Sequence, residues 1–348
     1  MFAFPVLVGD IGGTNARFAV VESKGAAPRL LSHEETASHP DPSSAIRAAL
    51  AKDGQGGEQG GRQGDKQPGG RAPRSAILAI AGRVDGPKVQ LTNAHWVIEG
   101  ARIGADFDLE TSVVVNDYVP VAAGAAGIAP HDLTLVGPAG HEPGGARVVL
   151  GPGTGFGAAA LVPYSDRLAI VSTEAGHTDL GPSDAFEEKV WHALERVEDR
   201  ITIETVLSGP GLARLHAAVR HVRTGEPAEK IEPAAVTQAG LDASDPHAVE
   251  ALELFGRVLG RVCGDLALTF LATGGVYIGG GIAPRIVKLL QQGGFRAAFE
   301  HKAPFSPMMQ AIPTSVITVH DPAFTGLAAL ASEGETFVYH GQVWRRGI

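Results

Sequence analysis

The sequence predicts a duplicated α/β protein of two domains with a ligand cleft between them. Each half of the chain contains two short apolar runs joined by a glycine-rich turn, which is the pattern of a β-hairpin. Segments with helical or buried-strand patterns follow each hairpin. The length of 348 residues suits two domains, and 44% hydrophobic residues provide enough apolar side chains for two cores.

In the first half, apolar runs at 5–10 (PVLVGD) and 17–21 (RFAVV) flank Gly12-Gly13-Thr14-Asn15 and predict the first hairpin. A helix is expected to include residues 45–50. Continuous short apolar runs at 75–81 and 112–116 predict strands that are buried on both faces.

Residues 53–74 interrupt this pattern with eight glycines among 22 residues and no large apolar side chain. Such a segment buries too little surface to offset the entropy lost on ordering. A flexible insertion is therefore predicted, and a cover over a cleft is the alternative.

The second half begins with runs at 147–150 and 158–162, which flank the glycine-rich segment 151–157 (GPGTGFG) and predict a second hairpin. Asp184 followed by Glu187 is typical of a helix N-terminus. The helix after it is expected to present one apolar face, formed by Phe186, Val190, Ala193, Leu194 and Val197.

Pro246 is expected to open a further helix, because proline is tolerated in the first helical turn. Its apolar face consists of Val249, Leu252, Phe255, Leu259 and Val262. Residues 276–278 predict a strand that ends in Gly279-Gly280-Gly281, and Pro284 is expected to start the next helix.

The charge and cysteine content exclude several classes of protein. The 29 Lys and Arg residues against 38 Asp and Glu residues give a net charge of −9, which does not suit a nucleic-acid partner. A single cysteine excludes a disulfide framework and any zinc or iron–sulfur site built from several cysteines. A reducing compartment is expected.

No targeting or membrane segment is expected either. Residues 1–9 carry no charged side chain, whereas a secretory signal begins with a basic region. The most apolar stretch elsewhere, 112–128, contains Asn116 and Asp117 and is too short to span a bilayer. These observations predict a cytoplasmic protein with no membrane partner.

The two glycine-rich turns have the composition of phosphate-binding loops. Glycines let backbone N–H groups approach an anion, because no Cβ intervenes. Thr14 and Thr154 add hydroxyl groups, and Asp10 could hold a metal ion or its waters. An ordinary hairpin is the alternative for each loop, but four glycines at every second position in 151–157 disfavour it. Gly279, Gly280 and Gly281 offer a third surface for close approach.

The motifs together resemble the bacterial glucokinase family, in the hexokinase branch of the actin-like, Hsp70-like ATPase superfamily. The resemblance extends from residue 7 to about residue 330 and rests on seven motifs in the family's order. They are LVGDIGGTNARFAV (7–20), LTNAHW (91–96), VVVNDY (113–118), GPGTGFG (151–157), TEAGHTD (173–179), ETVLSGPGL (204–212) and GGVYIGGGIAPR (274–285).

The resemblance implies a two-domain actin-like ATPase (ribonuclease H-like) fold with the ligand cleft between the domains. It implies a small α/β domain at 1–120, with the insertion 53–74, completed by 318–334. The large α/β domain is expected at 121–317. A C-terminal tail, 335–348, is not placed by any motif and carries Phe337, Tyr339 and Trp344. The family also implies a homodimer.

The resemblance further implies the role of each site residue. Asp117 matches the general base that accepts the proton of the sugar's 6-hydroxyl, a task that suits a carboxylate; a cap for the following segment is the alternative. The residues that match hexose ligands are Asn93, Asn116, Asp117, Glu174, His177 and Glu204. A metal site at Glu174 and His177 is an alternative that the absence of nearby His or Cys disfavours.

The cofactors implied are ATP and Mg²⁺. Asp10 matches the residue that holds Mg²⁺, usually through water. The residues that match the ATP and phosphate contacts are Asp10, Gly12, Gly13, Thr14, Asn15, Gly153, Thr154, Gly155, Gly279, Gly280 and Gly281. Such loops supply the positioning and charge neutralisation that phosphoryl transfer requires.

The function implied is ATP-dependent phosphorylation of glucose to glucose 6-phosphate. A kinase of another hexose or amino sugar is one alternative, because residues 93–96 (NAHW) depart from the family's usual sequence at this motif. A sugar-sensing regulator with the same fold and no turnover is another. Such regulators usually carry an N-terminal DNA-binding helix pair, for which a phosphate loop at residue 10 is expected to leave no room. Only Cys263 is present, which excludes the related group with a cysteine-rich zinc motif.

Overall fold

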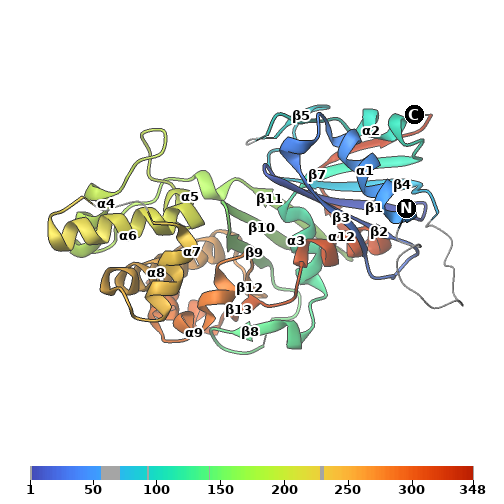
Figure 1. The fold of residues 1–348 in the computed structure, drawn as a ribbon. Helices are drawn as coiled ribbons and strands as arrows, with labels where there is room; N and C mark the ends of the chain where they lie inside the picture. The colour runs from blue at the N-terminus through green and yellow to red at the C-terminus, as the bar shows by residue number, and fades with distance from the viewer. Residues whose placement is uncertain (1, 56–70, 92–93, 141, 228–230, 348) are drawn as a thin grey trace, which may run out of the picture. The chain divides into compact units, whose positions relative to one another are not determined.

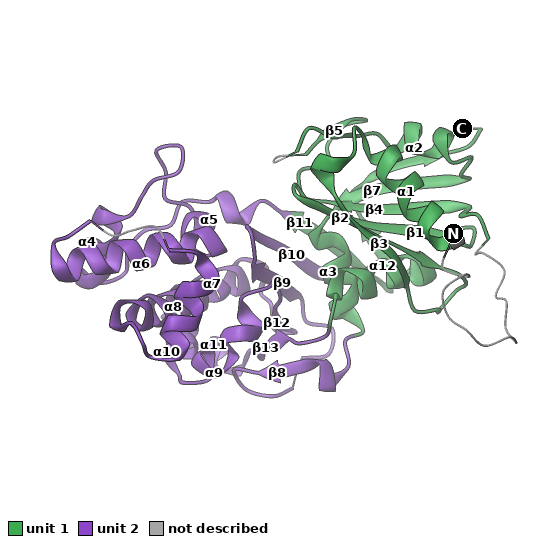
Figure 2. Cartoon of the chain, in the orientation of Figure 1, with its two compact units in different colours: residues 1–127, 164–172, 320–348 green, residues 128–163, 173–319 purple. Residues whose placement is uncertain are grey.

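The computed structural model describes residues 2–55, 71–91, 94–140, 142–227 and 231–347 (Figure 1). The chain divides into two compact units, which Figure 2 shows in different colours. Unit 1 comprises residues 1–127, 164–172 and 320–348, and unit 2 comprises residues 128–163 and 173–319.

Unit 1 combines strands with helices on both faces of a sheet. Its elements are β1 (Val6–Ile11), β2 (Asn15–Val21), β3 (Arg29–Glu35), η1 (Thr36–Ser38), α1 (Pro42–Gln55), β4 (Ser75–Ile80), β5 (Val89–Gln90), β6 (Val97–Ile98), α2 (Gly100–Asp106), β7 (Thr111–Asn116), α3 (Tyr118–Ala126), β11 (Arg167–Thr173, except its last residue), α12 (Pro322–Glu333), β14 (Phe337–Tyr339) and β15 (Gln342–Arg345).

The six-stranded sheet of unit 1 has the order β15-β7-β4-β1-β2-β3. β1 pairs with β2 as an antiparallel hairpin, whereas β1, β4 and β7 run parallel. The register aligns Ile11 with Ile80 and Ile80 with Asn116. The carboxyl ends of these three strands therefore meet at one edge of the sheet, where open α/β sheets bind their ligands.

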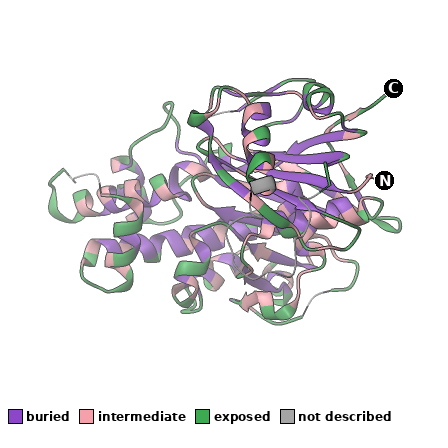
Figure 3. Ribbon diagram, turned by 45° about the vertical axis from the view of Figure 1, so that its right-hand side comes forward, coloured by how far each residue is buried: buried purple, intermediate pink, exposed green. Residues whose placement is uncertain are grey.

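Both faces of this sheet are covered, so its central strands are almost wholly buried (Figure 3). On one face Leu7, Ile11 and Leu78 belong to a core cluster with Ile46 of α1 and Ile103 of α2. α12 packs against β1 and β2 and against α3. The continuous apolar runs of the sequence follow from this double coverage.

The pair α3 and α12 is packed so closely that backbone meets backbone. A Cβ added at Gly326 of α12 would overlap the carbonyl of Pro120 in α3, and one added at Gly124 would lie 3.2 Å from the nitrogen of Gly326. Because α3 begins directly after Asp117, this contact fixes the helix that follows the end of β7.

Unit 2 has a five-stranded arrangement and a helical layer. Its elements are η2 (Pro130–Asp132), β8 (Leu133–Leu135), β9 (Arg147–Pro152), β10 (Phe156–Tyr164, except its last residue), η3 (Ala175–His177), α4 (Ala185–Ala193), α5 (Ile203–Val206), α6 (Gly209–Thr224), α7 (Pro233–Leu241), α8 (Pro246–Phe270), β12 (Gly275–Ile278), η4 (Ala283–Ile286), α9 (Val287–Leu290), α10 (Gly294–Glu300), α11 (Ser306–Ala311) and β13 (Thr314–Ile317).

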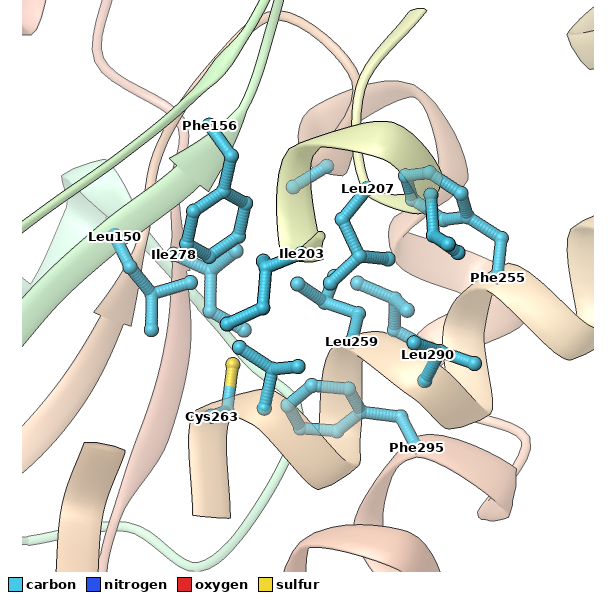
Figure 4. Close-up of a cluster of buried hydrophobic side chains, with 14 of the residues drawn as sticks. Leu150, Phe156, Ile203, Leu207, Phe255, Leu259, Cys263, Ile278, Leu290 and Phe295 are labelled. Carbon is cyan, nitrogen blue, oxygen red and sulfur yellow. The ribbon is translucent and has the colours of Figure 1, made fainter. Parts of the chain in front are cut away.

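The strands of unit 2 follow the order β10-β9-β12-β13-β8. β9 and β10 form an antiparallel hairpin, and β9, β12 and β13 run parallel. The long helix α8 contributes Phe255, Leu259 and Cys263 to the core cluster shown in Figure 4. Burial raises the pKa of the Cys263 thiol, as expected for an inert core residue.

The predicted hairpins, the predicted strands and the helix that Pro246 opens are confirmed. Asp184 is the N-cap of α4 as expected, accepting hydrogen bonds from the nitrogens of Phe186 and Glu187 at 2.9 and 2.8 Å. The extent of that helix was predicted wrongly, because α4 ends at Ala193. Leu194 is extended but still buried, so an apolar residue at helical spacing fills the core without being helical.

The rest of that prediction also needs correction. Val197 is exposed and forms an isolated β-bridge with Arg200. Pro284 does not open a regular helix, because it lies in the 3-10 helix η4, which continues into the single turn of α9. Proline at such a position removes only an N–H that has no partner within the helix.

The glycine-rich insertion starts later than residue 53, since α1 continues to Gln55. Residues 56–70 lie outside the described residues. The two units also divide the chain at somewhat different positions from those expected. Residues 121–127 belong to unit 1, where α3 packs on α12, and 164–172 belong there with β11, which pairs in parallel with β14.

The C-terminal residues 335–348 also belong to unit 1. β15 pairs antiparallel with β7 and forms the edge of the sheet. The ring of Trp344 lies so close to Gly104 of α2 that a Cβ there would overlap it. The tail therefore covers the outer side of the strand that leads to Asn116 and Asp117. Within the described part of the chain, no helix has the length and apolar character needed to cross a bilayer.

The α3–α12 contact predicts a strong effect of Gly326→Ala. The added methyl group would push against the Pro120 carbonyl, and we expect the free energy of unfolding to fall by about 3 kcal/mol, at the upper end of overpacking effects. Urea denaturation measures it. Gly127→Ala is the control, because a Cβ there meets nothing within 4 Å. Equal stability of both variants would contradict the close packing.

Candidate functional site

The edge of unit 1 where the parallel strands end carries the predicted Asp10 and Gly12-Gly13-Thr14-Asn15 turn. The turn is closed by the nitrogen of Gly12, which donates to the carbonyl of Asn15 at 2.9 Å. Thr14 and Asn15 are exposed. A Cβ at Gly12 would only touch the Asn15 carbonyl at an ordinary 3.5 Å. The fold therefore does not require glycine at position 12.

Asp10 is held by an arginine that sequence reasoning missed. Arg17 lies directly opposite Asp10 in the β1–β2 hairpin, and its Nη2 contacts Asp10 Oδ2 at 2.5 Å. Its Nη1 pairs with Asp321, which precedes α12, and its guanidinium lies 5.2 Å from the ring centroid of Phe324. Burial lowers the pKa of Arg17, but hydrogen bonds to Asp10 and Asp321 raise it above its ordinary value.

The Asp10–Arg17 pair of this network could have been found from the sequence. In a hairpin whose turn is Gly12–Asn15, opposite charges at positions 10 and 17 face each other across the strands. Asp321 could not have been found in this way, because it lies 304 residues further along the chain from Arg17. Only the packing of α12 on β1 brings it there.

Asn116 and Asp117 lie at the end of β7, and the side chain of Asn116 bonds to the start of α3. The Nδ2 of Asn116 donates to the carbonyl of Gly82 at 3.2 Å, and its Oδ1 accepts from the nitrogen of Tyr118 at 3.0 Å. Asn116 thus satisfies the start of α3, and Asp117 makes no capping hydrogen bond with its side chain. The capping alternative for Asp117 is therefore not supported.

The backbone of Asp117 continues the sheet, because its nitrogen donates to the carbonyl of Ile80 at 2.9 Å. Burial raises the pKa of the neighbouring Tyr118, and the negative charge of Asp117 raises it further. Asp117 therefore extends the pairing of β7 by its backbone and lies beside a tyrosine whose pKa is raised. Asn93, the remaining predicted sugar residue of this unit, lies outside the described residues.

In unit 2 the tip of the β9–β10 hairpin is the predicted loop Gly153-Thr154-Gly155. The nitrogen of Gly153 donates to the carbonyl of Gly155, and the nitrogen of Gly209 donates to the carbonyl of Gly153, both at 2.8 Å. Thr154 is exposed at the tip. A Cβ at Gly153 would have one neighbour, the nitrogen of Gly281 at 4.0 Å, so this glycine also faces open space.

The glycines that follow β12 pack directly on this hairpin. β12 is the parallel neighbour of β9, and the nitrogen of Gly279 continues the pairing by donating to the carbonyl of Leu150 at 2.7 Å. A Cβ at Gly151 would overlap the backbone of Gly279. Gly280 has a positive φ of 78° and lies against the carbonyl of Pro152. The structure thus brings the second phosphate loop and the third glycine motif together.

The three predicted sugar residues of unit 2 lie on two segments that contact the end of this loop. Glu174 and His177 are exposed at the two ends of the short turn η3, and Gly176 between them lies against the carbonyl of Phe156. Glu204, in α5, accepts a hydrogen bond from the nitrogen of Phe156 at 2.7 Å. Residues from two motifs that are far apart in the sequence therefore contact the backbone of Phe156, which belongs to a third motif.

The turn that carries Glu174 and His177 is fixed from outside by Arg200. Its Nη2 donates to the carbonyl of His177 at 2.9 Å, and its Nε donates to Asp179 at 2.9 Å. The nitrogen of Ile203 donates to the carbonyl of Thr178 at 3.0 Å, which ties the turn to α5. The two carboxylates and the imidazole are thus presented by a braced turn and a buried helix.

Among the residues with described positions, no group of three or more His, Cys, Asp and Glu side chains is arranged to hold a metal ion. A magnesium ion that arrives with a nucleotide needs only one or two carboxylates, since phosphate oxygens and waters complete its shell. Asp10, beside an open glycine turn, fits that requirement.

Comparisons with known proteins agree on one family. A family model described as Glucokinase matches residues 7–334. The glucokinase of Brucella suis is 41% identical over 346 residues, which cover 99% of this chain and 96% of the relative.

Solved structures share the fold. The crystal structure of a glucokinase from an Antarctic psychrotroph is 29% identical with a TM-score of 0.78, over 94% of this chain and 99% of that one. A ROK family glucokinase from Streptomyces griseus, in complex with glucose and AMPPNP, has a TM-score of 0.60 at 22% identity, over 95% of this chain and 100% of that one. These likenesses confirm the predicted two-domain α/β fold of the actin-like ATPases.

The packing of the hairpin tip predicts a large effect for one alanine substitution and almost none for another. Gly151→Ala would press a methyl group into Gly279 and should lower the free energy of unfolding by about 2–3 kcal/mol. Gly153→Ala should change it by no more than about 0.5 kcal/mol, because the methyl group meets open space. Urea denaturation of both variants tests this. A strongly destabilised Gly153→Ala would mean that the fold, and not a ligand, demands that glycine.

Proposed function

Because this chain is an enzyme of the glucokinase family, we propose that it transfers the γ-phosphoryl group of ATP to the 6-hydroxyl of glucose. The observation that carries the proposal is that carboxylates and a glycine-rich loop, the groups that this reaction needs for proton transfer and phosphate binding, lie at the ends of parallel strands. Asp10 and Asp117 are carboxylates at the edge of one sheet, and the glycine-rich loop at the edge of the other lies beside Glu174, His177 and Glu204.

The acceptor oxygen must lose its proton as the new bond forms. In the proposed reaction Asp117 accepts the proton of the 6-hydroxyl, while the bond between O6 and the γ-phosphorus forms and the bond between the γ-phosphorus and the β,γ-bridging oxygen breaks. The products are glucose 6-phosphate and ADP, and the proton passes from Asp117 to water. Supporting this role, the Asp117 side chain is not used to cap α3, because Asn116 does so.

The phosphates are proposed to meet Gly12, Gly13, Thr14 and Asn15, as well as Gly153, Thr154 and Gly155. Gly12 and Gly153 support this most directly, since neither is required by its own backbone or by close neighbours. Residues 279–281 are proposed to lie against the rest of the nucleotide. Magnesium, held by Asp10 and the phosphates, would neutralise charge that develops on the transferred group. Arg17 keeps the Asp10 carboxylate in one orientation for that purpose.

The sugar is proposed to be read by Asn116, Glu174, His177 and Glu204, with Asn93 as a further candidate. Each sugar hydroxyl both donates and accepts, so carboxylates, an imidazole and an amide together can distinguish stereoisomers. Asn116 has one amide proton and one lone pair beyond its two backbone hydrogen bonds. We therefore propose that Asn116 contacts the sugar with that remaining capacity.

The decisive experiment is a coupled assay of the purified protein with Mg·ATP and a panel of glucose, mannose, glucosamine and fructose. Turnover strongest on glucose is expected. Turnover strongest on another sugar would change the substrate, and binding of sugar without any turnover would replace the kinase by a regulator.

Asp117→Asn should lower kcat by roughly 10²–10⁴-fold, because the amide cannot accept the proton. Glucose should still bind, since the amide keeps hydrogen-bonding capacity at the same position. Steady-state kinetics measure the first effect, and calorimetry with glucose measures the second. Near-normal turnover in this variant would remove Asp117 from the role of base.

Glu174→Ala should weaken glucose binding by about 1.5–3 kcal/mol, the contribution of a hydrogen bond to a charged group. Glu188→Ala is the matched control, because Glu188 is an exposed carboxylate on α4 outside the cluster. Calorimetric titration with glucose compares the two variants. If Glu174→Ala binds glucose as tightly as the control does, Glu174 is not a sugar ligand.

A further inference from the structure

Glu204 supports the glycine-rich loop of unit 2 as well as lying among the proposed sugar residues. Its Oε2 accepts a hydrogen bond from the nitrogen of Phe156 at 2.7 Å, at the point where the loop becomes β10. A Cβ at Gly155 would lie 2.5 Å from the same oxygen. Glycine at position 155 is therefore what allows the carboxylate to reach the loop.

The turn Glu174–His177 contacts the same residue, Phe156, through the carbonyl group of Phe156. The carbonyl of Phe156 lies against Gly176, between Glu174 and His177, so closely that a Cβ at Gly176 would overlap it. The backbone of Phe156 thus contacts Glu204 through its N–H group and the Glu174–His177 turn through its carbonyl. A displacement of either sugar-binding segment has to move the end of the glycine loop.

Neither side of this contact can easily give way. The ring of Phe156 lies in the core of unit 2, in the same cluster as Ile203, the first residue of α5, and Leu207, which follows that helix (Figure 4). The hydroxyl of Ser208 donates to the carbonyl of Glu204 at 2.8 Å, and the next residue, Gly209, donates to the carbonyl of Gly153. Close-packed cores transmit such displacements instead of absorbing them.

We infer that Glu204 is a positioning residue for the loop 153–155, and that it couples the binding of sugar to the binding of nucleotide phosphates. This inference rests on the proposed function. A sugar hydroxyl that binds Oε1 fixes the carboxylate, and the carboxylate fixes the Phe156 N–H group and with it the loop. The nucleotide then binds to a loop that is already ordered, so each ligand raises the affinity for the other by the same factor.

Calorimetric titration with Mg·AMPPNP, with and without saturating glucose, tests this coupling in the full-length protein. In the absence of sugar, Glu204→Ala should bind Mg·AMPPNP about tenfold more weakly than wild type, as expected for the loss of one hydrogen bond to a charged group. Glu204→Gln keeps an acceptor oxygen and should stay within about threefold of wild type. Glucose should raise the affinity of wild type but not that of Glu204→Ala.

Glu174→Ala is the matched control, because Glu174 belongs to the proposed sugar set and, within the described part of the chain, its carboxylate is not hydrogen-bonded to the loop 153–155. It should lose glucose affinity and keep wild-type affinity for Mg·AMPPNP without sugar. If Glu204→Ala behaves as Glu174→Ala does, Glu204 is a sugar ligand alone and the inference is wrong. If wild type binds no Mg·AMPPNP at all, the proposed function fails first.

A second pair of variants keeps the inference testable if Glu204→Ala folds poorly. Gly155→Ala adds a methyl group against the Glu204 carboxylate and should weaken Mg·AMPPNP binding about tenfold. In the double variant Gly155→Ala with Glu204→Ala the carboxylate is gone, so the added methyl group has nothing to displace. The loss of Mg·AMPPNP affinity in the double variant should therefore be much smaller than the product of the two single losses. Losses that multiply in full would show that the two residues act independently, against the inference.

Discussion

The parallel pairing of β1, β4 and β7 is the constraint on which the candidate site of unit 1 depends. Its register aligns Ile11, Ile80 and Asn116, so Asp10, the turn after β1, and Asp117 all lie at one edge of the sheet. A shift of one residue in β1 would turn Asp10 toward the core face occupied by Leu7 and Ile11, where an ionised carboxylate is costly to bury. The hydrophobic pattern of the strands therefore also fixes the position of the polar groups.

Unit 2 repeats this device with β9 and β12, but its loop is supported differently. Gly279 and Gly280 lie against the backbone of the β9–β10 hairpin, and Glu204 reaches the hairpin from α5. In unit 1 the corresponding polar support is Arg17, which holds Asp10 and Asp321. Both sites thus combine an exposed loop with a charged side chain anchored on a rigid element, which limits the entropy lost when a ligand binds.

Six glycines of the three motifs differ in what a side chain at their position would meet. Gly151 and Gly280 are required because a side chain there would overlap backbone, and a side chain at Gly155 would displace the Glu204 carboxylate. Gly12, Gly153 and Gly281 have no such neighbour, and a Cβ at Gly281 would have nothing within 4 Å. Under the proposed function, glycine at these positions would leave room for the close approach of the nucleotide phosphates.

By itself, the sequence determined the structural features that depend on residues close together along the chain. The hairpins, the buried strands and the Asp184 cap were predicted, because periodicity and turn composition act over short distances. The tertiary structure decided the early end of α4 at Ala193, the edge strand β15, the Arg17–Asp321 pair and the contact of Glu204 with Phe156. These features join residues that are far apart in the sequence, or set packing against local propensity, and no local pattern contains them.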